Sequence, residues 1–275
     1  MPRLSTSSSI NFRKRSVSES TLPPIVFVNA LGQGPAAWSR LRDRVGGHPT
    51  SVWSPELSWT RTEQEEQLAR LLSGRSAHLV AWCTGPKTAL RVAADYPELV
   101  ESLVFLNPSF KGPGRPLDID TEYESELVDL LSTVRSRPGM AARLIDALNR
   151  RRASNPSSSI GLPAELDDPG TSVFRDAATL IAYAERHLEF WADDPLMDPR
   201  VKALEVPTTV VSGAQDVVVA PSDVARIAAS FPRSNSVEVN GGHFALYTHS
   251  DEVAQALSAH LAAAEVSPGS LSLPR

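Results

Sequence analysis

The stretch Ala81-Trp82-Cys83-Thr84-Gly85-Pro86-Lys87-Thr88-Ala89-Leu90 decides the fold. An apolar run ends at Cys83, and a helical pattern begins at once with Gly85 and Pro86. Proline fits the first turn of a helix, where its missing N–H costs nothing. Ala81 and Gly85 stand two residues before and after the cysteine, and such small residues let a strand and a helix approach closely. The pattern predicts a sharp strand-to-helix turn with Cys83 at its tip.

A nucleophile elbow has this arrangement, since its G-x-S-x-G motif places the nucleophile on a strained turn between a strand and a helix. Here the motif is A-x-C-x-G, with Cys83 in place of serine. The alternative is an ordinary buried cysteine, because an unpaired cysteine packs as a small hydrophobic residue. The stretch by itself fits both a reactive and a structural thiol.

Composition narrows the class of protein. Of 275 residues, 41% are hydrophobic and 21% are charged, which is typical of a globular chain with a sizeable core. The net charge of −5 disfavours nucleic acid as a partner. The chain has no apolar run of ~18 residues, so we expect no membrane span. A single cysteine forms no internal disulfide and agrees with a reducing compartment, so we expect a cytoplasmic protein.

The two ends of the chain differ from the rest in composition. Residues 1–22 are Ser-rich, basic and aperiodic, and we expect a disordered N-terminal segment or, as the alternative, short edge strands that are only loosely paired. They lack the apolar centre of a secretory signal, and the alternative is an Arg-bearing, acid-poor transit peptide. Residues 267–275 are polar and rich in Pro and Ser, so we predict a flexible tail.

Short apolar runs alternate with helical spacing in the first half of the chain. Such alternation predicts strands buried in a parallel sheet with helices on both faces. For the helix at 62–72, Thr62 and Glu65 have the spacing of a capping box. The expected strands lie at 25–28, 51–53, 78–82 and 103–106, and the expected helices at 38–45, 62–72 and 85–96.

The pattern changes between 111 and 200, where helical spacing and Pro or Gly breaks replace strands. We expect helices at 127–134, 141–148 and 180–191, and a mobile stretch at 155–170. Strands resume at 207–211 and 236–239, with helices at 221–229 and 252–264. The domain prediction is an α/β core of 23–110 and 201–266, interrupted by a helical insertion at 111–200. Simple core packing would explain the apolar stripes of these helices, but the position of the insertion between two strands favours a lid over a pocket.

Cys83, Asp216 and His243 each follow a predicted strand. The carboxyl ends of parallel strands meet at one edge of the sheet, where ligands bind, so we expect these residues to converge. Asp216 can instead cap the turn after its strand, and His243 can be an ordinary loop histidine. The chain order of nucleophile, acid and histidine favours catalysis.

Other candidate groups have weaker patterns. Asp193, Asp194 and Asp198 look like helix ends or exposed turns. Gly32 and Gly34 lack the rest of a dinucleotide motif, and no ligand spacing indicates a metal, so we expect no cofactor and no metal. Arg150-Arg151-Arg152 is a solvated helix end or a contact for an acidic protein. The histidines without partner spacing, read as structural or surface groups, are His48, His78, His187, His249 and His260.

From about Pro24 to Ala264 the chain resembles the α/β-hydrolase superfamily. The resemblance rests on the loop at 29–34, AWCTG at 81–85, the helical insertion, VVSGAQD at 210–216 and NGGHF at 240–244, in this order. The departures are Asn29-Ala30 where His-Gly is usual, Ala81 for the first glycine, and cysteine for serine. The resemblance implies an α/β-hydrolase fold, a mostly parallel doubly wound sheet with a helical lid insertion.

The same resemblance implies roles for individual residues. Cys83 is the expected nucleophile, His243 the base and general acid, and Asp216 the group that orients the imidazole. The backbone N–H groups of Leu31 and Thr84 are the expected oxyanion hole.

The cysteine favours one class of substrate. A thiol ionises far more readily than a hydroxyl, and its thiolate exchanges one thioester for another in a nearly balanced step. The sequence resembles cysteine-bearing thioesterases and aminoacyl transferases of nonribosomal peptide and related assembly lines. That resemblance implies an acyl thioester substrate, and a carrier protein partner bearing phosphopantetheine. An ester or lactone hydrolase and a catalytically silent binding protein are the other readings, and the sequence favours no particular oligomeric state.

Overall fold

A computed structural model describes residues 22–154, 161–168 and 172–266. The disordered segment predicted at 1–22 and the tail predicted at 267–275 lie outside these residues, apart from Leu22. Part of the mobile stretch predicted at 155–170 also lies outside them. Among the described residues, no helix combines the length and apolar character needed to cross a membrane.

In the described part of the chain, parallel strands form one sheet in the order β2-β1-β3-β4-β5-β6. Parallel neighbours need crossover connections, which the intervening helices supply. The predicted α/β fold with a parallel sheet is therefore confirmed. The strands are β1 (Ile25–Val28), β2 (Thr50–Trp53), β3 (Ala77–Trp82), β4 (Val100–Leu106), β5 (Thr208–Gly213) and β6 (Ser234–Val239).

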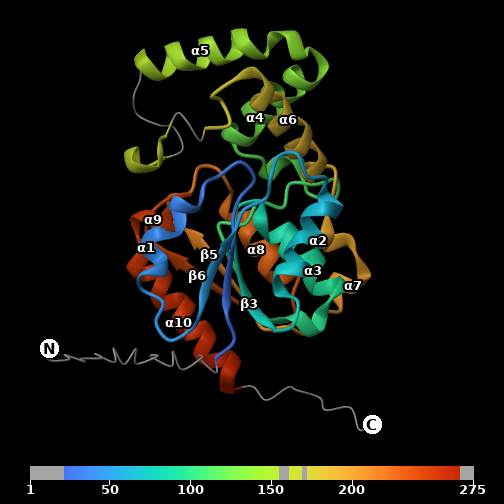
Figure 1. Ribbon diagram of the computed structural model, residues 1–275, viewed down its shortest axis with the longest axis vertical. Helices are drawn as coiled ribbons and strands as arrows, with labels where there is room; N and C mark the ends of the chain where they lie inside the picture. The colour runs from blue at the N-terminus through green and yellow to red at the C-terminus, as the bar shows by residue number, and fades with distance from the viewer. Residues whose placement is uncertain (1–21, 155–160, 169–171, 267–275) are drawn as a thin grey trace, which may run out of the picture.

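Helices cover both faces of the sheet (Figure 1). Because successive strand residues point to opposite faces, Val26 and Val28 join one hydrophobic cluster while Ile25 and Phe27 join another. The first cluster includes α2 (Arg61–Leu72), α3 (Gly85–Asp95), α7 (Pro199–Lys202) and α8 (Pro221–Ala229). The second includes α1 (Ser39–Arg42), α9 (Ala245–Thr248) and α10 (Ser250–Val266).

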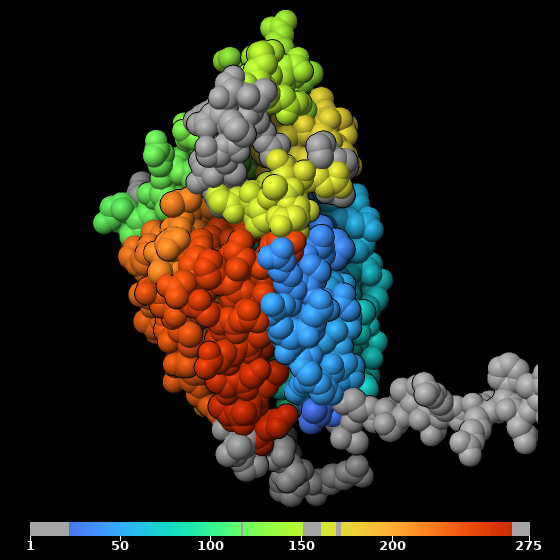
Figure 2. Space-filling view, turned by 90° about the vertical axis from the view of Figure 1, so that its left-hand side faces the viewer, coloured from blue at the N-terminus to red at the C-terminus, as the bar shows by residue number. Residues whose placement is uncertain are grey.

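The chain between β4 and β5 is helical and has a hydrophobic cluster of its own. Its long helices are α4 (Glu122–Ser136), α5 (Ala141–Ser154) and α6 (Ala177–Trp191). Leu131 of α4 and Leu180 of α6 are fully buried, and Leu31 after β1 joins their cluster. Figure 1 shows this segment, green to yellow, above the carboxyl ends of the strands, and Figure 2 shows it on top of the core.

Two local predictions were wrong. The capping box of α2 is formed by Thr60 and Glu63, two residues earlier than predicted. The Thr60 hydroxyl accepts from the Glu63 N–H, and the Glu63 carboxylate accepts from the Thr60 N–H. The helix predicted at 38–45 is a 3-10 turn, Pro35–Trp38, followed by the four residues of α1. Val45 still packs in the core, so its apolar spacing reflects burial and not a continuous helix.

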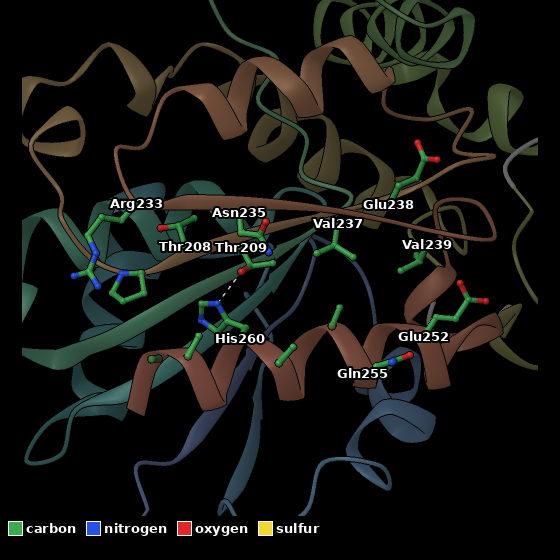
Figure 3. A pocket seen from close by; sticks show the side chains of 15 residues that line it. Thr208, Thr209, Arg233, Asn235, Val237, Glu238, Val239, Glu252, Gln255 and His260 are labelled. Atoms are coloured by element: carbon green, nitrogen blue, oxygen red, sulfur yellow. Dashed lines mark hydrogen bonds between the residues drawn. The ribbon is translucent and has the colours of Figure 1, made fainter. Parts of the chain in front are cut away.

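A groove of about 480 Å³ lies between β6 and α10 (Figure 3). The alanines of α10 line one side, and His260 bonds to Thr209 at 2.8 Å within it. Cys83, Asp216 and His243 are not among its lining residues. The groove is therefore separate from the predicted catalytic residues.

Candidate active site

Cys83 stands on the turn between β3 and α3 with φ of 56°. This left-handed conformation is uncommon for a residue with a side chain, and it recurs where function requires a strained turn. The Cys83 N–H donates to the Leu106 carbonyl at 3.1 Å, and the Cys83 carbonyl accepts from the Ser109 N–H at 2.8 Å. These bonds hold the turn, and the cysteine is only half-buried.

Gly85 allows α3 to begin directly against β1. A Cβ at this position would lie 2.7 Å from the Val28 oxygen and 2.9 Å from the Asn29 oxygen. Both contacts are with backbone, which cannot move aside as a flexible side chain can. The small residue expected from the sequence is therefore required by close packing of the helix on the strand.

Gly85→Ala is expected to lower the free energy of unfolding by about 1–3 kcal/mol, the usual cost of forcing extra atoms into a packed interior. Chemical denaturation measures the change. Gly34→Ala is the matched control, because a Cβ at Gly34 meets nothing within 4 Å, and its effect should stay within about 0.5 kcal/mol. Equal effects of the two substitutions would contradict this account.

Asp216 and His243 form a buried pair after β5 and β6. His243 Nδ1 lies 2.9 Å from Asp216 Oδ2, and the two side chains are 5% and 4% exposed. Asp216 Oδ1 accepts hydrogen bonds from the N–H groups of Val218 at 2.7 Å and Val219 at 3.1 Å. The carboxylate is thus fixed on one side by the chain and presents its other oxygen to the imidazole.

His243 also contacts Cys83. Burial opposes the charged imidazole, but the charge of Asp216, together with the charge and hydrogen bond of Cys83, raises the pKa of His243 to about 10. Because Nδ1 is bonded to Asp216, the nitrogen left for the sulfur is Nε2. The raised pKa of His243 favours a positive imidazolium between a carboxylate and the cysteine sulfur, which is the arrangement that stabilises a thiolate.

Asn107, which directly follows the strand predicted at 103–106, positions the histidine loop. It has φ of 42°, a conformation that asparagine tolerates better than most residues. Its Nδ2 donates to the carbonyls of Gly242 and His243, both at 3.0 Å, and its Oδ1 accepts from the Gly213 N–H at 2.7 Å. Asn107 thereby ties the ends of β4 and β5 to the loop that carries His243.

Asn29, where histidine is usual, organises the loop after β1. It is fully buried; its Oδ1 accepts from the Ala30 N–H at 3.0 Å, and its Nδ2 donates to the Gln33 carbonyl at 2.7 Å. The Leu31 N–H, an expected oxyanion donor, donates to the Thr84 hydroxyl at 2.9 Å. The two expected oxyanion residues are therefore in contact, but the Leu31 amide already has an acceptor.

Two tyrosines of the helical insertion lie within electrostatic range of the cysteine. Burial raises the pKa of Tyr123 on α4 and of Tyr183 on α6, and the charge of Cys83 raises both further. Tyr183 also lies against Gly32, where a Cβ would meet its ring at 3.1 Å. The insertion thus places aromatic hydroxyl-bearing side chains near the sulfur.

The alpha/beta hydrolase fold model matches residues 62–250, well over half of the chain. The chain belongs to the alpha/beta hydrolase fold family. The match includes the Cys83 turn, the helical insertion, Asp216 and His243. No curated protein matches the chain in sequence.

Solved structures share this hydrolase fold at low sequence identity. The haloalkane dehalogenase of Bradyrhizobium elkani has 18% identity and a TM-score of 0.66, with 90% of this chain and 92% of that one covered. The enol-lactonase of Burkholderia xenovorans LB400 has 19% identity and a TM-score of 0.60, with coverage of 87% and 91%. A bacterial membrane phospholipase A has 20% identity and a TM-score of 0.62, with coverage of 89% and 80%. These likenesses show the fold.

The three other candidate acids of this hydrolase-fold chain, Asp193, Asp194 and Asp198, have structural partners. Asp193 bonds to Arg91 at 2.6 Å and to Arg61 at 2.8 Å, and Asp198 bonds to Arg91 at 2.6 Å. Asp194 accepts from the Leu196 N–H and so caps a 3-10 turn. Among the described residues, Asp216 is the carboxylate hydrogen-bonded to His243.

The other histidines also have contacts elsewhere. His78 bonds to Ser102 at 2.7 Å and its ring meets His48, while His187 packs between Tyr183 and Trp191. His249 bonds to Thr248 at 2.9 Å. Of the three arginines at 150–152, the side chains of the last two lie outside the described part of the chain.

Proposed function

We propose that this hydrolase-fold protein transfers or hydrolyses acyl groups of thioesters through a covalent acyl-Cys83 intermediate. The observation that carries the proposal is the His243 imidazole, hydrogen-bonded to Asp216 and to Cys83, whose raised pKa keeps it positive at neutral pH. A serine-type hydrolase needs a neutral imidazole to deprotonate its hydroxyl. A charged imidazole instead suits a cysteine that already carries the negative charge.

The first half-reaction begins with attack of the Cys83 thiolate on the thioester carbonyl carbon, which forms a carbon–sulfur bond and a tetrahedral oxyanion. Collapse of this intermediate breaks the substrate's own carbon–sulfur bond. His243 gives its Nε2 proton to the departing sulfur, so a free thiol leaves and the imidazole becomes neutral. Asp216 remains ionised throughout and holds the imidazole in place.

The second half-reaction returns the enzyme to its resting state. The acceptor, which is a thiol, an amine or water, loses its proton to His243 as it attacks the acyl-cysteine. The Cys83 thiolate departs, and the thiolate and imidazolium are restored. We propose that phosphopantetheine thiols of carrier proteins are the donor and the acceptor, because transfer of an acyl group from one thioester to another through a cysteine is nearly balanced in free energy. Such transfers would serve the biosynthesis of nonribosomal peptides or similar products.

Intact mass spectrometry after mixing with an S-aminoacyl-N-acetylcysteamine thioester tests this function. The expected result is a mass increase equal to the acyl group on the native protein and none on Cys83→Ala. Added free thiol should discharge the acyl group faster than water does. An adduct that persists in Cys83→Ala overturns the assignment.

An oxygen ester, p-nitrophenyl acetate, distinguishes a thioester-specific enzyme from the main alternative, an ester or lactone hydrolase. Turnover of the ester without loading from the thioester would favour an ester or lactone hydrolase. The lactonase and phospholipase among the similar folds make that the second candidate. Cys83→Ser serves as the matched variant. Because it has a hydroxyl in place of the thiol, it should no longer prefer the thioester over the oxygen ester.

A further inference from the structure

The Thr84 hydroxyl accepts a hydrogen bond from the Leu31 N–H, one of the two backbone groups expected to bind the oxyanion. Its Oγ1 is 2.9 Å from the Leu31 nitrogen, across 53 residues of chain, and both residues are 3% exposed. Thr84 precedes the first residue of α3, yet its hydroxyl does not cap that helix. The hydroxyl is therefore used for a contact with the loop after β1 and not for the usual purpose of threonine at a helix start.

The Thr84 hydroxyl has one further hydrogen-bonding capacity. A hydroxyl both accepts and donates, and here it accepts from the Leu31 N–H. Within 22–154, 161–168 and 172–266, no residue accepts a hydrogen bond from this hydroxyl. A hydroxyl that accepts one hydrogen bond becomes a better donor in the next, because the bonds polarise one another in a buried site.

We propose that the Thr84 hydroxyl donates to the oxyanion formed at Cys83, as the second link of a chain that begins at the Leu31 N–H. The inference rests on the proposed function, since it requires a tetrahedral intermediate at this sulfur. Thr84 is next to Cys83 in the chain, so the two residues share the turn between β3 and α3. Thr84 is then a catalytic residue through its side chain, and the Leu31 amide acts through it.

The competing arrangement has the hydroxyl as a plug. In that case the side chain rotates away when substrate enters, and the Leu31 N–H itself meets the oxyanion. The two arrangements predict opposite effects of removing the hydroxyl. In the relay, removal of the hydroxyl deprives the oxyanion of its donor. In the plug arrangement, the same change frees the Leu31 N–H to bind the oxyanion.

Three substitutions at Thr84 test the proposal, with the rate of Cys83 acylation by phenyl thioacetate followed by intact mass and by thiol release. Thr84→Val keeps the shape and removes the hydroxyl, so kcat should fall by about 10²–10³-fold with KM nearly unchanged, as for loss of one oxyanion donor. Thr84→Ser keeps a hydroxyl and should retain kcat within about tenfold. Thermal unfolding of each variant shows whether the fold persists.

Thr84→Ala decides between relay and plug. The relay predicts a loss similar to that of Thr84→Val, and an unchanged or higher kcat in Thr84→Ala overturns the proposal. Equal losses in Thr84→Ser and Thr84→Val overturn it as well, because the hydroxyl would then be irrelevant.

Failure of the thioester function is distinguishable from failure of this inference. If Cys83 is acylated by p-nitrophenyl acetate but by no thioester, the proposed function fails, and the same comparison of variants is made with the ester. A Cys83 that neither compound acylates overturns both proposals.

Discussion

Replacing His243 with alanine is expected to lower kcat/KM for an acyl thioester by about 10⁴-fold or more. The substitution removes the positive charge beside the sulfur and the proton that the departing thiol takes. Both losses act on acylation, so the burst of acyl-enzyme should disappear together with turnover. Rapid-quench measurement of acylation separates this step from later release.

The pH dependence gives a second measurement on the same residue. The pKa of His243 is raised to about 10, so the imidazolium persists through neutral pH and is lost as pH rises through about 10. Acylation should accordingly decline only in that alkaline range. The stability that the charged pair contributes should be fully present below the unfolded pKa of about 6.5 and should be lost progressively as pH rises from there to about 10. An alkaline decline centred near pH 7 would contradict the charged resting state.

Two variants complete this test. Asp216→Asn should lower kcat by about 10³–10⁴-fold, because an amide holds the imidazole without supporting its charge. His48→Gln is the control: its ring meets His78 at the start of β3, the end opposite to Cys83, with ring centroids 5.4 Å apart. Activity of His48→Gln should remain within a few-fold of the native protein.

The sequence predicted the fold because its signals are local. The strand at 25–28 is continuously apolar and lies between two helical layers, and the turn at Cys83 is marked by small residues on either side. The convergence of Cys83, Asp216 and His243 was predictable for a topological reason, since each follows a parallel strand. Their roles in catalysis remain a prediction that the experiments above test.

The contacts that the sequence could not predict are long-range ones made by ordinary-looking residues. Thr84 bonds to Leu31 across 53 positions, and Asn107 reaches the histidine loop across 136. Neither contact can be read from the sequence, because a single long-range hydrogen bond produces no periodicity and no motif. The capping box shows the same limit at short range, since Thr60–Glu63 and Thr62–Glu65 have equal spacing and only the packed helix selects the first.

Lys87 is the clearest example of such a residue. It follows Cys83 by four positions on α3, it is 2% exposed, and its Nζ donates to the carbonyls of Lys111, Phe190 and Asp193. Lys111 lies where the helical insertion begins, and the other two lie where α6 ends. One ammonium group therefore joins both ends of the insertion to the helix that carries the nucleophile turn.

Burial disfavours the charged form of Lys87. Burial lowers the pKa of Lys87 to about 7, against the opposing charges of Asp193, Asp194 and Asp223 and with a small further lowering by Arg115. His187 of α6 also faces the ammonium, which contributes to the low pKa of that histidine. The unfolded chain, where a lysine has its ordinary pKa of about 10.4, therefore binds more protons than the folded chain between pH 7 and 10.

Comparison of the native protein with Lys87→Met should reveal this linkage. Stability rises with pH wherever the unfolded state binds more protons, so the free energy of unfolding of the native protein, minus that of Lys87→Met, should grow by about 1.4 kcal/mol per pH unit between pH 7 and 10. The opposite contribution of His243 is present in both proteins and cancels in the difference. Urea denaturation at pH 7, 8, 9 and 10 measures it, with Lys202→Met as the exposed control on α7. A difference that stays constant with pH would mean that Lys87 has an ordinary pKa in the folded protein. Burial would then not disfavour the ammonium group that joins the ends of the insertion.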